Sequence, residues 1–135
     1  MVNGETRMTY HFSKTVSLSM DAAIAKVTEA LKQEGFGILT EIDVQKTLKA
    51  KIDVDFRPYR ILGACNPGFA HKALLAEDKI GAMLPCNVVV QEKSPGSVEI
   101  SAVDPVASMQ AIDNPALVGI ASDVRSRLQR VIAQL

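Results

Sequence analysis

The spacing of apolar residues changes repeatedly along this 135-residue chain, and the order of those changes restricts the fold more than any other feature. Five segments have the alternating or continuous apolar pattern and the short length typical of strands. Between and after them, apolar residues recur every three or four positions, as they do on one face of a helix. The predicted order is therefore strand, helix, strand, short helix, strand, helix, hairpin and helix.

The predicted strands are frequent neighbours in the sequence. They are Tyr10–Leu18, Phe36–Ile42, Tyr59–Cys65, Cys86–Glu92 and Val98–Val103. The last two flank a Ser-Pro-Gly-Ser turn at positions 94–97 and are predicted to form a hairpin. A doubly wound parallel sheet would separate its strands by regular helices. We therefore expect an α+β domain with one antiparallel sheet of about five strands and helices packed on one face.

Each predicted helix is preceded by a residue that can cap its first turn. The capping residues are Ser19, Asp43, Asn66, Asp104 and Asn114. The last three are followed by proline, which suits the first position of a helix. The apolar spacing predicts that Leu48 and Ile52 point inward from the second helix. For the third helix, the residues predicted to face the core are Phe69, Ala73, Leu74 and Ile80.

The final predicted helix is long and has the most regular apolar stripe. Its members are Leu117, Ala121, Val124, Leu128, Val131 and Leu135. This spacing serves a helix that packs across its own sheet, and it also serves a short coiled-coil seam with a partner helix. An exposed part of this helix, or the hairpin edge Val88–Val90, would support a homodimer.

Charge and composition exclude several classes of protein. Fifteen Lys and Arg residues balance fifteen Asp and Glu residues, so the chain has no net charge to attract nucleic acid or an anionic membrane. The hydrophobic fraction of 47% is enough for a real core. We expect residues 1–8 to be a flexible tail and residues 9–135 to be a single domain. No segment is typical of a signal peptide or a membrane span, so a cytoplasmic protein with reduced thiols is expected.

The two cysteines lie in the least charged part of the chain, and each is followed by asparagine. Two cysteines are too few for a disulfide scaffold or for a four-cysteine zinc ribbon within one chain. If Asn66 caps a helix, Cys65 lies beside the positive end of that helix, where thiolate and small anions are stabilised. Both cysteines equally suit a small buried apolar position. Cys65, Asn66, Cys86 and Asn87 are the candidate ligand-binding residues.

Thiol or metal chemistry is the alternative function for the same residues. Antiparallel strands would bring Cys65 and Cys86 to the same edge of the sheet, whereas parallel strands would separate them. The antiparallel arrangement is favoured, so a reversible disulfide is a candidate. Cys65, His71 and Cys86 are candidate metal ligands, although their spacing matches no zinc pattern. No cofactor is predicted.

Motifs of known enzyme classes are missing from the sequence. It contains no GxGxxG, Walker loop, HExxH or GxSxG. A cysteine and a histidine are present, but no third group that would orient them is identifiable. A protein without catalytic turnover is therefore expected.

Three blocks of sequence carry a resemblance to a known family. They are GFGILTEIDV at 35–44, DFRPYRILGACNPGFAHKALLAEDKIGAMLPCNVVVQE at 55–92, and Val103-Asp104-Pro105. In this order they resemble the bacterial and archaeal domain of unknown function 302 family, over nearly the whole chain from Tyr10 onward. The resemblance implies a compact domain with a curved antiparallel sheet, a long C-terminal helix and a TATA-box-binding-protein-like β-α-β4-α arrangement. It also implies a homodimer.

The resemblance implies the fold of the chain but no particular activity, because proteins with the same fold can have different functions. It therefore does not imply DNA binding. The motif positions Cys65, Asn66, Cys86 and Asn87 remain the candidate site. We predict a small cytoplasmic binding or regulatory module, homodimeric, with a small-ligand or anion site at these residues. Thiol-redox or metal-thiolate chemistry at Cys65 and Cys86 is the alternative.

Overall fold

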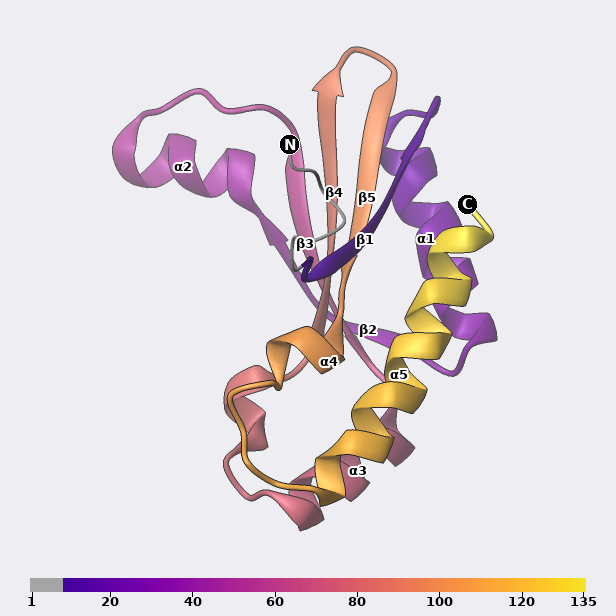
Figure 1. The fold of residues 1–135 in the computed structure, drawn as a ribbon. Coiled ribbons are helices and arrows are strands. Elements are labelled where there is room, and N and C mark those ends of the chain that lie inside the picture. Colours follow the sequence, from indigo (N-terminus) through magenta and orange to yellow (C-terminus); the bar gives the residue numbers. More distant parts are fainter. Residues whose placement is uncertain (1–8) are drawn as a thin grey trace, which may run out of the picture.

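The computed structural model describes residues 9–135. The predicted flexible tail, residues 1–8, lies outside the described residues. The described elements in chain order, drawn in Figure 1, are β1 (His11–Val16), α1 (Met20–Gln33), β2 (Gly37–Asp43), α2 (Val44–Ile52), β3 (Tyr59–Cys65), α3 (Pro67–Ala76), η2 (Ile80–Met83), β4 (Cys86–Ser94), β5 (Ser97–Val103), α4 (Pro105–Ser108) and α5 (Ala116–Ala133).

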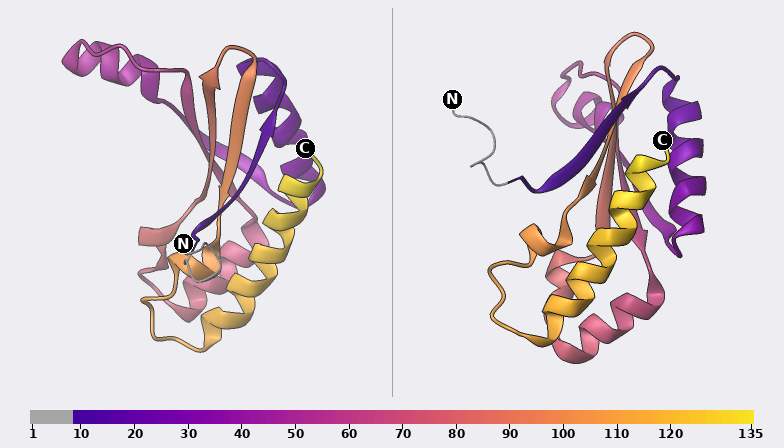
Figure 2. Two further views of the ribbon diagram at one scale, coloured as in Figure 1. Left: turned by 45° about the horizontal axis from the view of Figure 1, so that its top comes forward. Right: turned by 45° about the vertical axis from the view of Figure 1, so that its right-hand side comes forward.

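The five strands form one sheet in the order β1-β5-β4-β3-β2. Every neighbouring pair is antiparallel, so the predicted α+β class with a single antiparallel sheet is confirmed. β1 and β2 follow each other in the chain but lie at opposite edges of the sheet. The connection between them, α1, therefore crosses one face of the sheet, as the views in Figures 1 and 2 show.

α1 and α5 lie on the same face of the sheet and contact each other. All six residues of the stripe predicted for the last helix are buried: Leu117, Ala121, Val124, Leu128, Val131 and Leu135. Most of them join a core cluster with residues of the sheet and α1. The stripe therefore packs across the sheet of its own chain, and it does not serve as a coiled-coil seam for a partner helix. Within residues 9–135, no helix is both long and apolar enough to cross a membrane.

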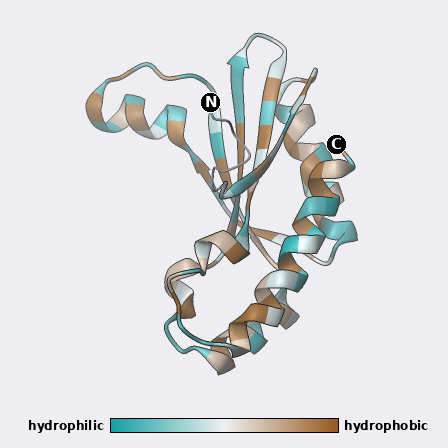
Figure 3. Cartoon of the chain, viewed as in Figure 1, coloured by the Kyte–Doolittle hydropathy of each residue, from teal (hydrophilic) through white to brown (hydrophobic). Residues whose placement is uncertain are grey.

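A second, smaller cluster lies beyond one end of the sheet. α3, η2, α4 and the first turns of α5 gather there, at the bottom of Figure 1. Ala73, Ile80 and Leu117 form the buried centre of this cluster. Apolar residues, brown in Figure 3, recur along α3 and α5 where the two helices approach each other. α5 thus spans both clusters and joins them.

The inward positions predicted for α2 are confirmed only in part, because Leu48 is half-buried and Ile52 is exposed. No residue of α2 is buried, and Ile52 is 63% exposed. Asp43 both ends β2 and caps α2, accepting a hydrogen bond from the Lys46 N–H at 2.9 Å. Because the helix continues directly from an edge strand, it projects away from α1 and α5 (Figures 1 and 2). The amphipathic pattern of α2 therefore meets little of its own chain.

The predicted inward face of the third helix needs one correction. Ala73 and Ile80 are buried, and Phe69 packs against the main core, but Leu74 is 45% exposed. α3 ends at Ala76, so Ile80 belongs to the separate turn η2. The break changes the direction of the chain, and only one narrow side of α3 therefore faces the core.

Candidate functional site

The antiparallel pairing of β3 and β4 brings the two cysteines to the same end of the sheet, where β3 ends and β4 begins. Cys65 ends β3 and Cys86 begins β4, and Ala64 lies directly opposite Cys86. The predicted antiparallel direction of these strands is confirmed. The cysteines are therefore near neighbours although 20 residues separate them in the sequence.

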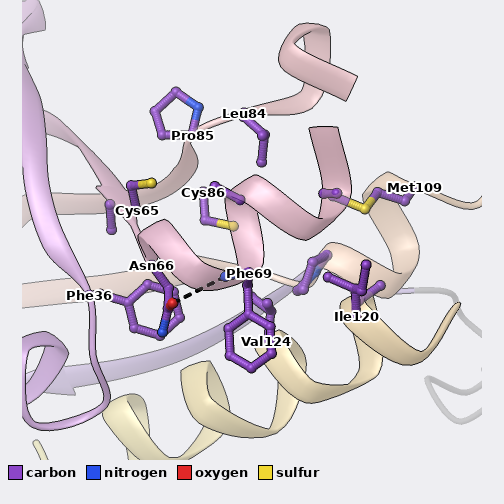
Figure 4. A pocket seen from close by; sticks show the side chains of 15 residues that line it. Phe36, Cys65, Asn66, Phe69, Leu84, Pro85, Cys86, Met109, Ile120 and Val124 are labelled. Atoms are coloured by element: carbon purple, nitrogen blue, oxygen red, sulfur yellow. Dashed lines mark hydrogen bonds between the residues drawn. The ribbon is translucent and has the colours of Figure 1, made fainter. Parts of the chain in front are cut away.

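The register nevertheless directs the two thiols to opposite faces of the sheet. Residues that lie opposite each other share a face, so Cys86 points to the same side as the fully buried Ala64. Cys65, the next residue along β3, points to the other side. Gly63 shares that side, and a Cβ placed there would lie 2.7 Å from the Pro85 ring. Both thiols are free, and Figure 4 draws the two side chains among the residues that line the neighbouring pocket.

Cys86 lines a pocket that lies between the two core clusters (Figure 4). The pocket encloses about 30 Å³, little more than the volume of one water molecule. Its lining contains no charged residue. The lining residues are Phe36, Ala64, Cys65, Asn66, Phe69, Ala70, Ala73, Leu84, Pro85, Cys86, Pro105, Met109, Ile120, Ala121 and Val124.

Burial controls the chemistry of the Cys86 thiol. Removal from water raises the pKa of this thiol to about 11, and the nearby Cys65 thiol adds to the rise. Cys86 is therefore protonated at neutral pH. A protonated, buried thiol behaves as a small apolar side chain, and it is a poor nucleophile and a poor metal ligand.

Asn66 begins α3, as its position before Pro67 predicts. Its side-chain oxygen accepts a hydrogen bond from the Phe69 N–H at 3.3 Å, drawn as the dashed line in Figure 4. Its amide nitrogen also faces Gly35, just beyond the C-terminus of α1. Gly35 has a φ of +87°, and a Cβ at this position would lie only 2.8 Å from the Asn66 amide nitrogen. Asn66 thus fixes the start of α3 against the end of α1.

Arg127 of α5 completes this junction, and the sequence interpretation did not single it out. Its guanidinium donates to the carbonyl oxygen of Glu34 at 2.9 Å and lies 5.1 Å from the centre of the Phe69 ring. Phe69 is a wall of the Cys86 pocket. The only sequence signal was a cation in the second half of a helix, which also suits the helix dipole. Arg127 therefore holds a pocket wall from outside.

Asn87 is not brought to the pocket. It follows Cys86 on β4 and so points to the opposite face of the sheet, where it is exposed. There it lines a separate shallow groove with Tyr59, Gln91 and Ser101. Of the four candidate residues, the structure gathers Cys65, Asn66 and Cys86 around one pocket and separates Asn87 from them.

The candidate metal ligands do not converge. His71 is exposed on α3 and is not among the residues that line the Cys86 pocket. In the part of the chain that the structure describes, no three side chains of His, Cys, Asp or Glu are placed to hold a metal ion. Cys65, His71 and Cys86 therefore do not form a metal site in this arrangement.

Comparison with known proteins adds a family to this geometry. The profile described as "Domain of unknown function DUF302" matches residues 12–135. A similar solved structure is that of an uncharacterized conserved protein DUF302 from Bacillus stearothermophilus, with 34% sequence identity and a TM-score of 0.86. The similarity covers 94% of this chain and 98% of that one. A search of curated proteins finds no significant match.

Proposed function

This chain belongs to the DUF302 family, and from that premise we propose that it is a small, non-catalytic binding module whose Cys86 pocket receives an uncharged, apolar part of a small ligand. The family supplies the fold, which the chain shares over nearly its whole length. The proposal about function comes from the pocket.

The observation that carries the proposal is the absence of charge from the pocket lining within the described residues. Aliphatic, aromatic and small side chains make up most of the walls, and Cys86 adds a protonated thiol. Moving a charged group into such surroundings costs far more than moving an apolar one. The sequence predicts a small-ligand or anion site, and the lining favours a ligand with an uncharged apolar group over an anion.

The start of α3 points in the same direction. A small anion at a helix N-terminus is held by the free N–H groups of the first turn. Here the side chain of Asn66 already accepts the hydrogen bond of the Phe69 N–H. The polar part of this region thus stabilises the fold, and the apolar part borders the cavity.

Thiol-redox and metal-thiolate functions have less support. Cys86 retains its proton at neutral pH, and the register places Cys65 on the other face of the sheet. A direct bridge would require one strand to turn over, because disulfide geometry tolerates only small displacements. We therefore do not propose thiol chemistry for this site.

The proposal also includes a cytoplasmic homodimer. Two unpaired thiols suit a reducing compartment. β2 is an edge strand of the sheet, and Leu39 and Ile42 on it are 66% and 49% exposed. Exposed edges with apolar side chains tend to pair with another chain. We propose that a second copy covers this edge.

Light scattering tests the dimer. We expect twice the chain mass of 14.5 kDa, and we expect Leu39→Lys to shift the protein toward the monomer. Leu75→Lys is the matched control, because Leu75 is 76% exposed on α3, away from β2. A monomeric wild-type protein at high micromolar concentration would refute the dimer.

Calorimetric titration with 1-octanol tests the pocket. We expect saturable binding to the wild type, and at least tenfold weaker binding to Cys86→Val, because the larger side chain fills the cavity. Ser101→Val is the matched control, because it makes a change of similar size at a half-buried residue of β5 that does not line the pocket, and it should bind as the wild type does. Equal affinity of the wild type and a folded Cys86→Val protein would overturn the proposed function.

A further inference from the structure

The Cys86 pocket is too small to hold a whole ligand, so the rest of the molecule must lie in a neighbouring space. A groove of about 290 Å³ runs between α4 and α5, close to the lower end of the sizes usual for small-molecule sites. Met109 and Ala121 line both the groove and the Cys86 pocket. The two spaces are therefore adjacent and share these side chains as a common wall.

We propose that the ligand is an elongated, uncharged molecule, a hydrocarbon chain with a neutral polar head, that lies in the α4–α5 groove with its apolar end beside Cys86. This inference rests on the proposed function and extends it to the ligand's class and entry route. The hydrocarbon chain of the ligand passes the side chain of Met109, and the polar head of the ligand remains at the outer end of the groove.

The lining of the groove matches an uncharged chain. The residues are Val106, Met109, Gln110, Ile112, Asn114, Leu117, Val118, Ala121 and Ser122, none of which is charged. Val106 and Val118 are 39% and 68% exposed. A hydrocarbon chain in the groove would remove their side chains from water, and such burial is favourable in proportion to the apolar area covered. The groove therefore continues the apolar character of the pocket to the surface.

Neutral polar groups are available only near the outer part of the groove. The amide of Asn114 is already engaged, since it donates to the Ala76 carbonyl oxygen at 2.8 Å and accepts from the Ala116 N–H at 3.0 Å. The side chains of Gln110 and Ser122 are exposed and can serve a hydroxyl or amide head. A charged head would find no ion partner among the residues that line the groove.

Met109 is suited to separate the two spaces and to move aside. It directly follows α4, is half-buried, and packs against the smaller core cluster (Figure 4). Methionine has three rotatable side-chain bonds and adapts to irregular spaces. A rotation of its side chain would join the groove to the pocket without moving the backbone of either helix.

Titration of hexanol, octanol and decanol against two variants of α5 tests this inference. Ser122→Trp places a large side chain in the groove, whereas Ser126→Trp makes the same change one turn later, outside the groove lining. We expect affinity to rise with chain length in the wild type. We expect Ser122→Trp to weaken decanol binding at least tenfold and Ser126→Trp to leave it within twofold.

The two proposals fail in distinguishable ways. If Cys86→Val weakens alcohol binding and Ser122→Trp does not, the groove is not part of the site and this inference is overturned, while the proposed function stands. If Ser122→Trp weakens binding and Cys86→Val does not, the ligand stops in the groove and both proposals fail. Far-UV circular dichroism of each variant confirms that it is folded.

Discussion

Cys86 lies directly opposite Ala64 in the antiparallel pair of β3 and β4, and this one register position determines the character of the site. The register points the Cys86 thiol toward the apolar pocket between the two core clusters, and it points the Cys65 thiol toward the other face of the sheet. Both cysteines border the pocket, but the register does not direct their thiols toward each other.

The first prediction concerns oxidation of the native protein. Treatment with diamide should produce no disulfide between Cys65 and Cys86, because their thiols leave opposite faces of the sheet. Half-buried Cys65 should react with thiol reagents faster than buried Cys86. Mass spectrometry of the non-reduced, digested protein checks both statements, and a Cys65–Cys86 bridge formed without unfolding would contradict the register argument.

The second prediction concerns alkaline stability. Burial raises the pKa of the Cys86 thiol to about 11 in the folded protein, from an ordinary value near 9. The folded state thus binds this proton more tightly than the unfolded state does, so the stabilisation is complete below pH 9 and is lost between about pH 9 and pH 11.

Urea unfolding of the wild type and Cys86→Val from pH 7 to pH 11 measures this difference. Other groups titrate equally in both proteins, so the wild type should lose more stability than the variant above pH 9. Parallel stability curves over the whole range would contradict a raised pKa at Cys86.

The third prediction concerns the junction between α1 and α3. Gly35→Ala should destabilise the protein by about 2 kcal/mol, because the position has a positive φ and its Cβ would press on the Asn66 amide. Gly119→Ala is the matched control in α5, because a Cβ at this position meets nothing within 4 Å. This substitution should stabilise the protein by about 0.5–1 kcal/mol, since alanine favours the helix more than glycine does. Urea denaturation compares the two, and equal effects would contradict the contact.

The fourth prediction concerns Asp104, which holds α4 in place. This buried carboxylate accepts from the Val106 N–H at 3.0 Å and pairs with Arg125 at 3.2 Å. Asp104→Ala should cost about 2 kcal/mol, since it removes both a helix cap and a charged hydrogen-bond partner. Because α4 also carries the groove, octanol affinity should fall in the same variant. Unchanged stability in urea would show that Asp104 is not a structural anchor.

The sequence pattern predicted correctly those elements whose structure depends on residues that are near them in the chain. The stripe from Leu117 to Leu135 was predicted residue by residue, because a long helix that crosses a sheet buries every member of a regular apolar face. The start of α3 at Asn66 was predicted for a similar reason, since a cap depends on only three or four neighbouring residues.

The failures concern properties that distant segments decide. The pattern of α2 resembles that of a packed helix, but Ile52 is exposed because an edge strand directs the helix away from the body. Asn87 directly follows Cys86 in the sequence, which predicts that both belong to one site. Successive residues of a strand point to opposite faces of the sheet, however, so the two side chains are separated. The groove beside Met109 was not predicted at all, because its walls come together only when α4 and α5 pack.

The central claim is that the Cys86 pocket holds the apolar end of the ligand, and a crystal structure with 8-bromo-1-octanol tests it most directly. The bromine marks the end of the chain through its anomalous signal. The account predicts a bromine peak in contact with the Cys86 sulfur, at about 4 Å, with the hydroxyl toward Gln110 and Ser122. A bromine peak outside this pocket, or a reversed chain with the hydroxyl beside Cys86, would contradict it.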